Sequence, residues 1–303
     1  ELESRLLDLH SRIQQGRYKP KPARRVYIPK GNGEQRPLSI QCVEDKLVQQ
    51  AVVTLLNQIY ETDFKGFSYS FRPARSQHDA LDALTYGLCK KKVNWVLDIR
   101  QFFDTVEYDW LIRMIQHRVS DKRLIKLITR WIKVGEVDDE GVRQPAQRGL
   151  PQGAVISPVL SNIYLHYVFD LWSHQWRQKR AKGEVLIVRY ADDAVLCFQN
   201  KWDANEYLAQ LHQRINKFGL AVHPEKTRLI RFGRYAKEQC AERNEGKPKT
   251  FDFLGFTHYC TMRRNGDFKV GRKTIRKRMV NQIGALQREL RRRMHEPIGL
   301  TLK

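Results

Sequence analysis

Two adjacent acids inside an apolar run are the residues whose type and spacing most strongly suggest chemistry. Residues 185–198 read VLIVRYADDAVLCF, which places Asp192 and Asp193 between two strand-like segments. Carboxylates at the tip of such a hairpin repel each other unless a cation lies beside them, and burying them without a partner is costly. A plain turn is the simpler interpretation, since Asp is common in turns.

A third acid lies near the end of another apolar segment. Asp98 belongs to NWVLDI, and Asp104 follows a short distance beyond it. Nearly all-apolar strands of this kind are typical of a sheet covered on both faces. If the strands of Asp98 and Asp192 lie in one sheet, their carboxylates can meet at the same edge. That arrangement predicts two magnesium ions, roughly 3.5–4 Å apart, of the kind that assist in-line phosphoryl transfer.

The charge of the chain points to a polyanionic partner. The 303 residues contain 55 Lys and Arg against 33 Asp and Glu, a net charge of +22. Nucleic acid is the first candidate and an anionic membrane surface the second. Residues 261–303 are especially basic, with 13 Lys and Arg against three acids. A solvated helix face is the simpler interpretation of that segment, but a chain that is basic throughout favours nucleic acid.

Several classes of protein are disfavoured by composition. No run of 18 apolar residues is present, and the first residues are charged and amphipathic, so neither a transmembrane helix nor a signal peptide is expected. The five cysteines are widely spaced and form no C-x-x-C pair, which excludes a zinc ribbon. We expect reduced, mostly buried thiols of a cytoplasmic protein rather than a disulfide framework.

The order of elements predicts an α+β protein. Periodicity and turn signals predict helices at 1–18, 45–60, within 70–88, after 157 and at 203–218, and a helix-rich segment at 110–134. They predict a hairpin at 24–40, a strand at 94–99, a strand–turn–strand unit at 185–198 and strands at 219–232 and 251–259. Helices and antiparallel hairpins therefore alternate along the chain.

Seven segments, in order, resemble a reverse transcriptase, and more narrowly the bacterial group II intron-encoded (maturase) kind. They are RRVYIPKGNGEQRPLSI, GFSYSFRPARSQHDAL, DIRQFFD, RGLPQGAVISPVLSN, YADD, GLAVHPEKTRL and FDFLGFTHY. One four-letter motif is weak evidence, whereas seven in the expected order make a specific match over nearly the whole chain.

The resemblance implies the fingers and palm of a right-hand polymerase, with an antiparallel palm sheet, packed helices and a thumb that is largely absent. We expect fingers with an N-terminal extension helix at 1–92 and a palm with an interleaved fingers segment at 93–262. Residues 263–303 are expected to be a basic linker and the start of the thumb. Such a unit, a natural short form or a trimmed chain, is expected to grip a template–primer duplex more weakly.

By position, the resemblance assigns Asp98, Asp192 and Asp193 to a catalytic site for two magnesium ions. Asp98 and Asp192 are expected to be the principal ligands, and Ile99 to offer a backbone carbonyl to the ion on the nucleotide side. Lys226, in HPEKT, matches a lysine placed near the pyrophosphate and is a candidate general acid. A surface lysine with no catalytic role is the alternative.

The resemblance also implies a site for the incoming dNTP. Arg24, Lys30 and Arg36 lie in or beside the hairpin whose cations hold the triphosphate in this family, although general contact with nucleic-acid backbone is an alternative. Phe102 matches the residue that crowds the sugar 2′ carbon and so selects dNTPs, with core packing as the alternative. Gln152, in LPQG, is expected to brace the nascent base pair, with helix capping as the alternative.

Arg72 and Arg75, in FRPARS, are expected to order the fingers and to touch template phosphate. The implied activity is RNA-templated DNA synthesis, with an RNA template, a DNA or RNA primer, dNTPs and structured intron RNA as partners. A domesticated relative in CRISPR adaptation, phage defence or repair would share that chemistry. Two other classes stay open, a splicing factor with an idle polymerase site and a metal-dependent nuclease. The clustered acids disfavour the first, and the hairpin with Phe102 disfavours the second.

Overall fold

A four-stranded sheet carries the acids. The computed structural model describes residues 2–29, 35–99, 106–138, 140–144, 149–220 and 227–295. Within it, the central sheet has the strand order β6–β7–β3–β8, and all its neighbouring strands are antiparallel. These strands are β6 (Val185–Tyr190), β7 (Asp193–Phe198), β3 (Trp95–Ile99) and β8 (Arg228–Arg231). The expected antiparallel sheet and the expected hairpin at 185–198 are both present.

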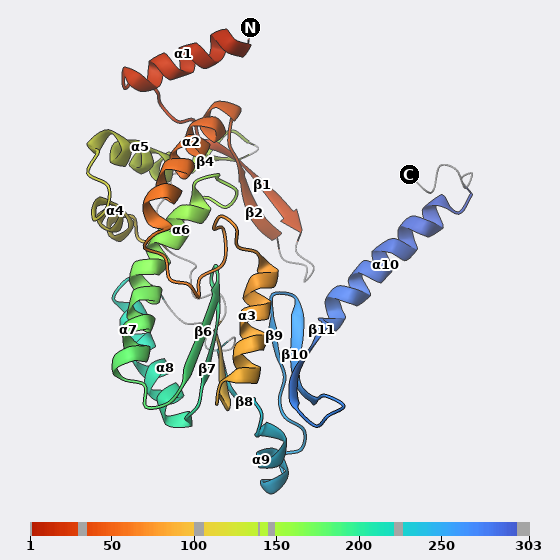
Figure 1. The fold of residues 1–303 in the computed structure, drawn as a ribbon. Helices are drawn as coiled ribbons and strands as arrows, with labels where there is room; N and C mark the ends of the chain where they lie inside the picture. Colours follow the sequence, from red (N-terminus) through yellow and green to blue (C-terminus); the bar gives the residue numbers. More distant parts are fainter. Residues whose placement is uncertain are drawn as a thin grey trace.

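Helices cover one face of the central sheet, as Figure 1 shows. Because side chains alternate along a strand, Leu97 and Leu196 point to this face, where they join a large apolar core. The same core receives Leu9 of the N-terminal helix and the apolar sides of seven further helical segments. These are α2 (Val43–Tyr60), α4 (Tyr108–Gln116), α5 (Lys122–Lys133), α6 (Ser157–Leu165), η1 (His166–Asp170), α7 (Leu171–Lys179) and α8 (Lys201–Asn216).

The opposite face of the central sheet is covered as well. Val96 and Val195 pack there in a second core against α3 (Gln77–Lys90), which begins with a reciprocal capping box between Ser76 and Asp79. The C-terminal sheet, of order β11–β10–β9, contributes to this core. It consists of β9 (Phe251–Phe253), β10 (Phe256–Met262) and β11 (Phe268–Thr274). The acids therefore lie on strands held from both sides.

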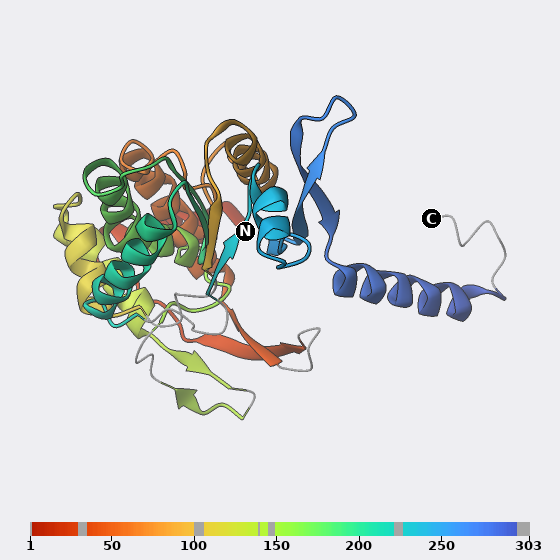
Figure 2. The same ribbon diagram turned by 90° about the horizontal axis from the view of Figure 1, so that it is seen from below.

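A smaller sheet projects away from the helical body in Figure 2. This hairpin sheet has the order β2–β1–β4–β5. Its strands are β1 (Ala23–Pro29), β2 (Gln35–Ile40), β4 (Glu136–Val137) and β5 (Arg143–Gln144). The predicted hairpin is thus present, and two short strands from a distant part of the chain extend it, with β4 parallel to β1.

Several predicted boundaries differ from the structure. The segment 251–259, expected to be one strand, is two, because Leu254 and Gly255 both have positive φ and reverse the chain between β9 and β10. The helix-rich segment expected at 110–134 is present and consists of two helices, α4 and α5. The long helix expected after 157 contains the π-helical turn η1 between α6 and α7.

The two ends of the chain are helical. The N-terminal helix, α1 (Leu2–Gln14), ends just before Gly16, which has a φ of +70°, so it is shorter than expected. Near the C-terminus, α9 (Ala236–Glu242) was not expected, and the basic segment forms α10 (Arg276–Arg293). Figures 1 and 2 show α10 extending from the body, and none of its residues is buried.

The five cysteines are free thiols, as expected. Cys197 and Cys240 are buried, whereas the other three are half-buried, so the expectation of mostly buried thiols holds for only two. No helix in the described part of the chain is long and apolar enough to cross a membrane.

Candidate active site

The strand register brings the predicted acids to one end of the central sheet. Ile99 is opposite Ala194, and Asp98 is opposite Val195, so β7 reaches Asp193 one residue beyond the last pair. Residues that face each other in an antiparallel pair share a face, as do residues two apart on one strand. Asp98 and Asp193 therefore belong to the same face of the sheet.

Asp98 is a buried carboxylate with a cationic neighbour. Its side chain is 1% exposed, and Arg228, opposite it on β8, places a guanidinium nitrogen 3.7 Å from its Oδ2. A buried carboxylate requires a positive or hydrogen-bonding partner. The half-exposed Arg228 supplies positive charge at the end of the sheet where the resemblance places a metal site.

Asp192 occupies the tip of the β6–β7 hairpin. Tyr190 pairs with Asp193, which leaves Ala191 and Asp192 as a two-residue tip. Ala191 has a φ of +53°, a left-handed conformation that is uncommon for a residue with a side chain. Both tip residues line a cleft of about 1390 Å³.

The donor chemistry of the acids fits magnesium. Asp98, Asp192, Asp193 and the carbonyl of Ile99 are all oxygen donors, which hard divalent cations prefer. Among the residues that the structure describes, no group of three or more His, Cys, Asp or Glu is arranged to hold a metal ion. The fit of these residues to magnesium therefore rests on two facts: all of them offer oxygen atoms, and all of them lie at the same end of the central sheet.

The cleft lies between the central sheet and the hairpin sheet. It exceeds the roughly 300–1,000 Å³ of a small-molecule pocket, so it has room for a nucleotide together with a partner base. One wall carries Asp192. The wall from the hairpin sheet includes Arg25 and Arg36, so acidic and cationic side chains line the same cleft.

The LPQG loop joins these walls. The Gln152 side chain accepts a hydrogen bond from Arg36 Nε (2.8 Å), and its backbone carbonyl accepts one from Ser39 N (2.7 Å). The alternative role of Gln152 as a helix cap is wrong, because the N-cap of α6 is Ile156 and makes no side-chain cap bond. Gln152 instead stands exposed on the cleft wall.

The structure distributes the predicted dNTP contacts unevenly. Arg36 lines the cleft, and so does Arg25, which sequence reasoning missed; Arg24 is exposed and does not line it. Arg25 is bonded to Glu136 and, at 2.7 Å, to Gln144, so it also ties β1 to β4 and β5. Three further predicted residues, Lys30, Phe102 and Lys226, lie outside the described residues.

Arg72 and Arg75 hold the loop before α3. The Arg72 side chain is 3% exposed, and all three of its nitrogens donate to protein oxygens, of Glu61, Lys65 and Ser68. These bonds hold the loop in place, and the expected contact of Arg72 with template phosphate stays a prediction. Arg75 is half-buried and bonds the Gly66 carbonyl (2.6 Å), and its predicted phosphate contact stays a prediction.

Sequence reasoning missed a polar network below the tip. Arg189, fully buried in β6, pairs with the fully buried Asp170 at 2.7 Å. The signal was the single arginine inside the apolar run VLIVRY, directly before the tip acids. A cation within a strand covered on both faces requires buried partners.

Comparison with known proteins identifies the family of the chain. A family model described as "Reverse transcriptase (RNA-dependent DNA polymerase)" matches residues 28–258. The chain belongs to the reverse transcriptase family. The resemblance seen in the sequence is thereby confirmed.

Relatives of this reverse transcriptase chain include intron-encoded proteins. Protein YkfC of Escherichia coli K12 is 37% identical over 219 residues, covering 62% of this chain and 57% of YkfC. The group II intron-encoded protein LtrA of Lactococcus lactis subsp. cremoris is 36% identical over 167 residues, covering 54% of this chain and 27% of LtrA. The chain thus spans between about a quarter and a little over half the length of these relatives.

Solved structures show the same fold. Apo telomerase from Candida tropicalis, truncated from its C-terminal domain, superposes with a TM-score of 0.59 at 16% identity, covering 84% of this chain and 55% of the telomerase chain. The predicted α+β polymerase architecture of fingers and palm is confirmed. Following the expected division of the chain, we call the central sheet the palm sheet and the hairpin sheet the fingers sheet.

Proposed function

We propose that this chain is an RNA-directed DNA polymerase, which extends a primer with dNTPs along an RNA template. One observation carries the proposal: the acids of β3 and of the β6–β7 tip lie at one end of the palm sheet, and Asp192 lines the same cleft as Arg25 and Arg36 of the hairpin sheet. Carboxylates suit metal cations, and guanidinium groups suit a triphosphate.

The residues of the chain take distinct roles in this proposal. Asp98, Asp192 and Asp193, with the Ile99 carbonyl, would hold two magnesium ions. When bound, such ions lower the pKa of an attacking hydroxyl and neutralise charge on the leaving pyrophosphate. Family membership supports a divalent metal, whereas the number of ions is part of the proposal.

The fingers and the connecting loop position the nucleotide. Arg36, with Lys30, binds the triphosphate as a cationic clamp, and Arg24, which does not line the cleft, adds positive charge to the same hairpin. Gln152 braces the nascent pair from the LPQG loop, and its bond to Arg36 couples that loop to the clamp. Phe102 excludes a 2′-hydroxyl, and Lys226 protonates the pyrophosphate as it leaves.

Primer extension with Asp192→Asn tests the polymerase proposal. We expect the variant to lose at least a thousandfold of the extension rate on an RNA template while its melting temperature and RNA affinity stay near those of the wild type, because Asn keeps the size of the side chain and removes a single charge. Asp109→Asn, an exposed acid on α4, is the control and should extend normally.

Each alternative class has its own outcome in this assay. A wild-type chain that binds RNA but extends no primer supports the splicing factor with an idle site. A chain that cuts the template in magnesium supports the nuclease. Full activity of Asp192→Asn would remove the tip from the catalytic site.

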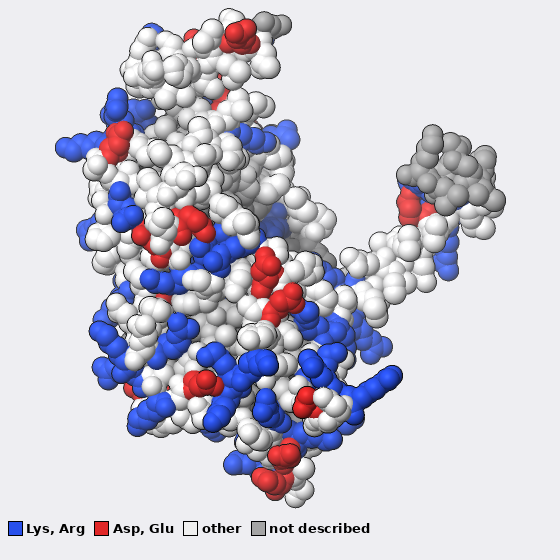
Figure 3. All heavy atoms as spheres, in the orientation of Figure 1, with Lys and Arg blue, Asp and Glu red and all other residues white. Residues whose placement is uncertain are grey.

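We further propose that the chain docks on structured RNA, as an intron-encoded protein of a bacterial mobile group II intron acting in the cytoplasm. LtrA, a relative, is named a group II intron-encoded protein. Lys and Arg side chains are spread widely over the face seen in Figure 3. A domesticated reverse transcriptase would use the same site chemistry with another RNA.

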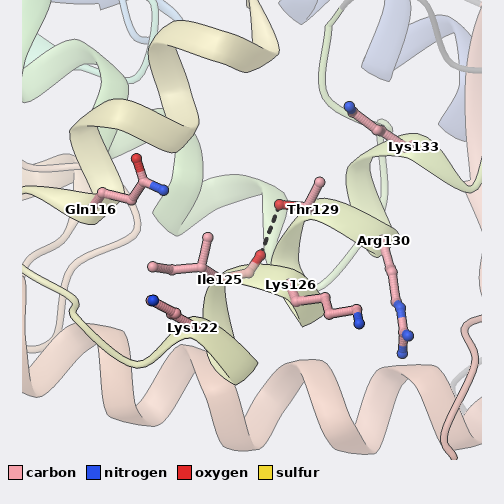
Figure 4. Close-up of a pocket in the computed structure, with 7 residues that line it drawn as sticks. All are labelled: Gln116, Lys122, Ile125, Lys126, Thr129, Arg130 and Lys133. Carbon is pink, nitrogen blue, oxygen red and sulfur yellow. Dashed lines mark hydrogen bonds between the residues drawn. The ribbon is translucent and has the colours of Figure 1, made fainter. Parts of the chain in front are cut away.

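Helix α5 supplies a defined cationic surface for such docking. Lys122, Lys126, Arg130 and Lys133 line a hollow of about 510 Å³ on this helix. Figure 4 shows Lys122, Lys126 and Arg130 extending from one side of α5. Basic residues at this spacing lie along one helix face, which suits phosphates of an RNA backbone.

A further inference from the structure

Five buried polar side chains surround the base of the Ala191–Asp192 tip. Arg189 and Asp170 are 0% exposed, as are Ser68 and Ser70, and Asn162 is 1% exposed. They come from β6, η1, the loop before α3 and α6. Polar groups are buried at this density only when they are bonded to one another, so the network has a defined geometry.

Arg189 is the centre of the network and uses every N–H of its guanidinium. Its Nε and Nη2 each donate to one oxygen of Asp170 at 2.7 Å, in a bidentate pair. Nη2 also donates to Ser68 Oγ (2.7 Å). Nη1 donates to Asn162 Oδ1 (3.2 Å) and to the carbonyl of Ala191 (3.1 Å).

Ser70 binds the backbone amide of Ala191, whereas Arg189 binds its carbonyl. The Ala191 amide donates to Ser70 Oγ at 2.6 Å, and the Ser70 carbonyl accepts from Asn162 Nδ2 at 2.7 Å. Both backbone groups of Ala191 are thus fixed by buried side chains of the network. The residue whose backbone they fix directly precedes Asp192.

The conformation of Ala191 requires such support. Its φ of +53° is strained for a non-glycine residue, and it persists only where the surroundings determine it. The π-helical turn η1 carries Asp170, and π turns occur often at functional sites. The bonds to Ala191 N and O therefore hold a strained turn in one shape.

Stability alone does not explain the pair of Arg189 and Asp170. Apolar residues of similar volume in place of a buried ion pair are often neutral or stabilising. Apolar residues cannot, however, donate to the Ala191 carbonyl or fix the direction of the tip. The part of the network that only polar groups can supply is the part that contacts the tip.

We propose that Arg189 and Ser70 are positioning residues that aim Asp192 into the cleft, with Asp170, Asn162 and Ser68 fixing the guanidinium. The inference rests on the proposed polymerase function. It predicts that loosening the network lowers the rate of nucleotide incorporation and raises the magnesium concentration that is needed, without weakening dNTP binding.

Ser70→Ala is the mildest test, because it removes one hydrogen bond to Ala191 and leaves the ion pair intact. Ser173→Ala is the matched control: Ser173 is also 0% exposed and makes one hydrogen bond, of 2.7 Å, to Tyr207. Tyr207 packs on Phe198, at the end of the palm sheet opposite the tip. The two variants lose comparable bonds at different places.

Two readouts are measured for both variants. In single-nucleotide incorporation we expect Ser70→Ala to lose about tenfold in kcat, with the KM for dNTP within twofold of wild type and a higher magnesium midpoint. In hydrogen exchange we expect the peptide that contains Ala191 to exchange at least tenfold faster. Ser173→Ala should leave both readouts at wild-type values, although both variants lower the melting temperature to a similar extent.

A second variant removes the centre of the network. The double variant Arg189→Met with Asp170→Leu leaves no unpaired charge, so we expect it to fold with the same kinetic defect and the same fast exchange at the tip. Wild-type kcat and wild-type exchange in Ser70→Ala or in the double variant would overturn the positioning role. If the wild-type chain and Ser173→Ala incorporate nothing, the polymerase proposal fails, while hydrogen exchange still decides whether the network holds the tip.

Discussion

Gly153 lets the LPQG loop touch the fingers sheet because it has no side chain. Its φ is +102°, and a Cβ at this position would lie 2.7 Å from Leu38 Cδ1 and 3.0 Å from the Ser39 carbonyl. Gly153→Ala therefore strains the backbone and pushes the loop from β2. We expect a loss of about 1–3 kcal/mol in unfolding free energy and about a tenfold rise in the KM for dNTP, measured by denaturation and primer extension.

Gly66 offers the control for this residue. Nothing lies within 4 Å of a Cβ built there, so Gly66→Ala should leave both the unfolding free energy and the KM near wild type. Equal effects of the two substitutions would contradict the role of close approach at Gly153. A normal KM in Gly153→Ala, despite lost stability, would separate the LPQG loop from nucleotide binding.

At the scale of elements, the palm strands β3, β6 and β7 were predictable because each is a short, nearly all-apolar segment of the kind found in a sheet covered on both faces. The hairpin at 24–40 followed from its turn signal and the helices from their periodicity. The strands β4 and β5 could not be found, since two residues carry no pattern and pair only after a distant hairpin has folded. Arg189 was missed for a similar reason: its partners come from three separate parts of the chain.

Helix α5 gives the prediction that belongs to this scale. Its exposed lysines Lys122, Lys126 and Lys133 should contact RNA phosphates, and each neutralised phosphate releases counterions. We expect the triple alanine variant to bind structured RNA about tenfold more weakly, with the slope of log K against log salt reduced by about 2. Extension of a short primer–template should stay unchanged. Filter binding across a salt series measures the first effect.

The control removes the same charge elsewhere. Lys217, Lys237 and Lys247 are exposed and lie outside α5, so their triple alanine variant has the same net charge. If both triple variants weaken RNA binding equally, the +22 charge acts as a diffuse field and α5 is no docking surface. If only the α5 variant extends the primer more weakly, α5 contacts the template strand of the primer–template and is not a separate docking surface.

At the scale of the whole molecule, two buried histidines make the cores on both faces of the palm sheet sensitive to acid. Burial lowers the pKa of His166 to about 4, and that of His258 to about 4. His166 packs edge-on against Phe64 in one core, while His258 stacks on Phe251 in the other, with ring centroids 4.8 Å apart. Each ring is held neutral in the fold.

The sign of the pH effect follows from linkage. An unfolded histidine binds a proton below about pH 6.5, whereas the folded rings do so only near pH 4. The unfolded state therefore binds more protons in this window, and stability falls as the pH drops through it. We expect the neutral state of each ring to lower the unfolding free energy by about 2–3 kcal/mol when the pH is reduced from 7 to 4.5. Urea titrations at both values measure the loss.

His258→Phe isolates one of these contributions, because a phenyl ring can keep the stack on Phe251 and cannot bind a proton. The loss between pH 7 and pH 4.5 should shrink by about 2–3 kcal/mol in this variant, whereas His212→Gln, at an exposed position on α8, should leave it unchanged. Aspartates and glutamates titrate alike in all three proteins, so their contribution cancels in the comparison. An acid loss in His258→Phe as large as in the wild type would show that the ring at His258 is protonated in the fold or exposed before unfolding.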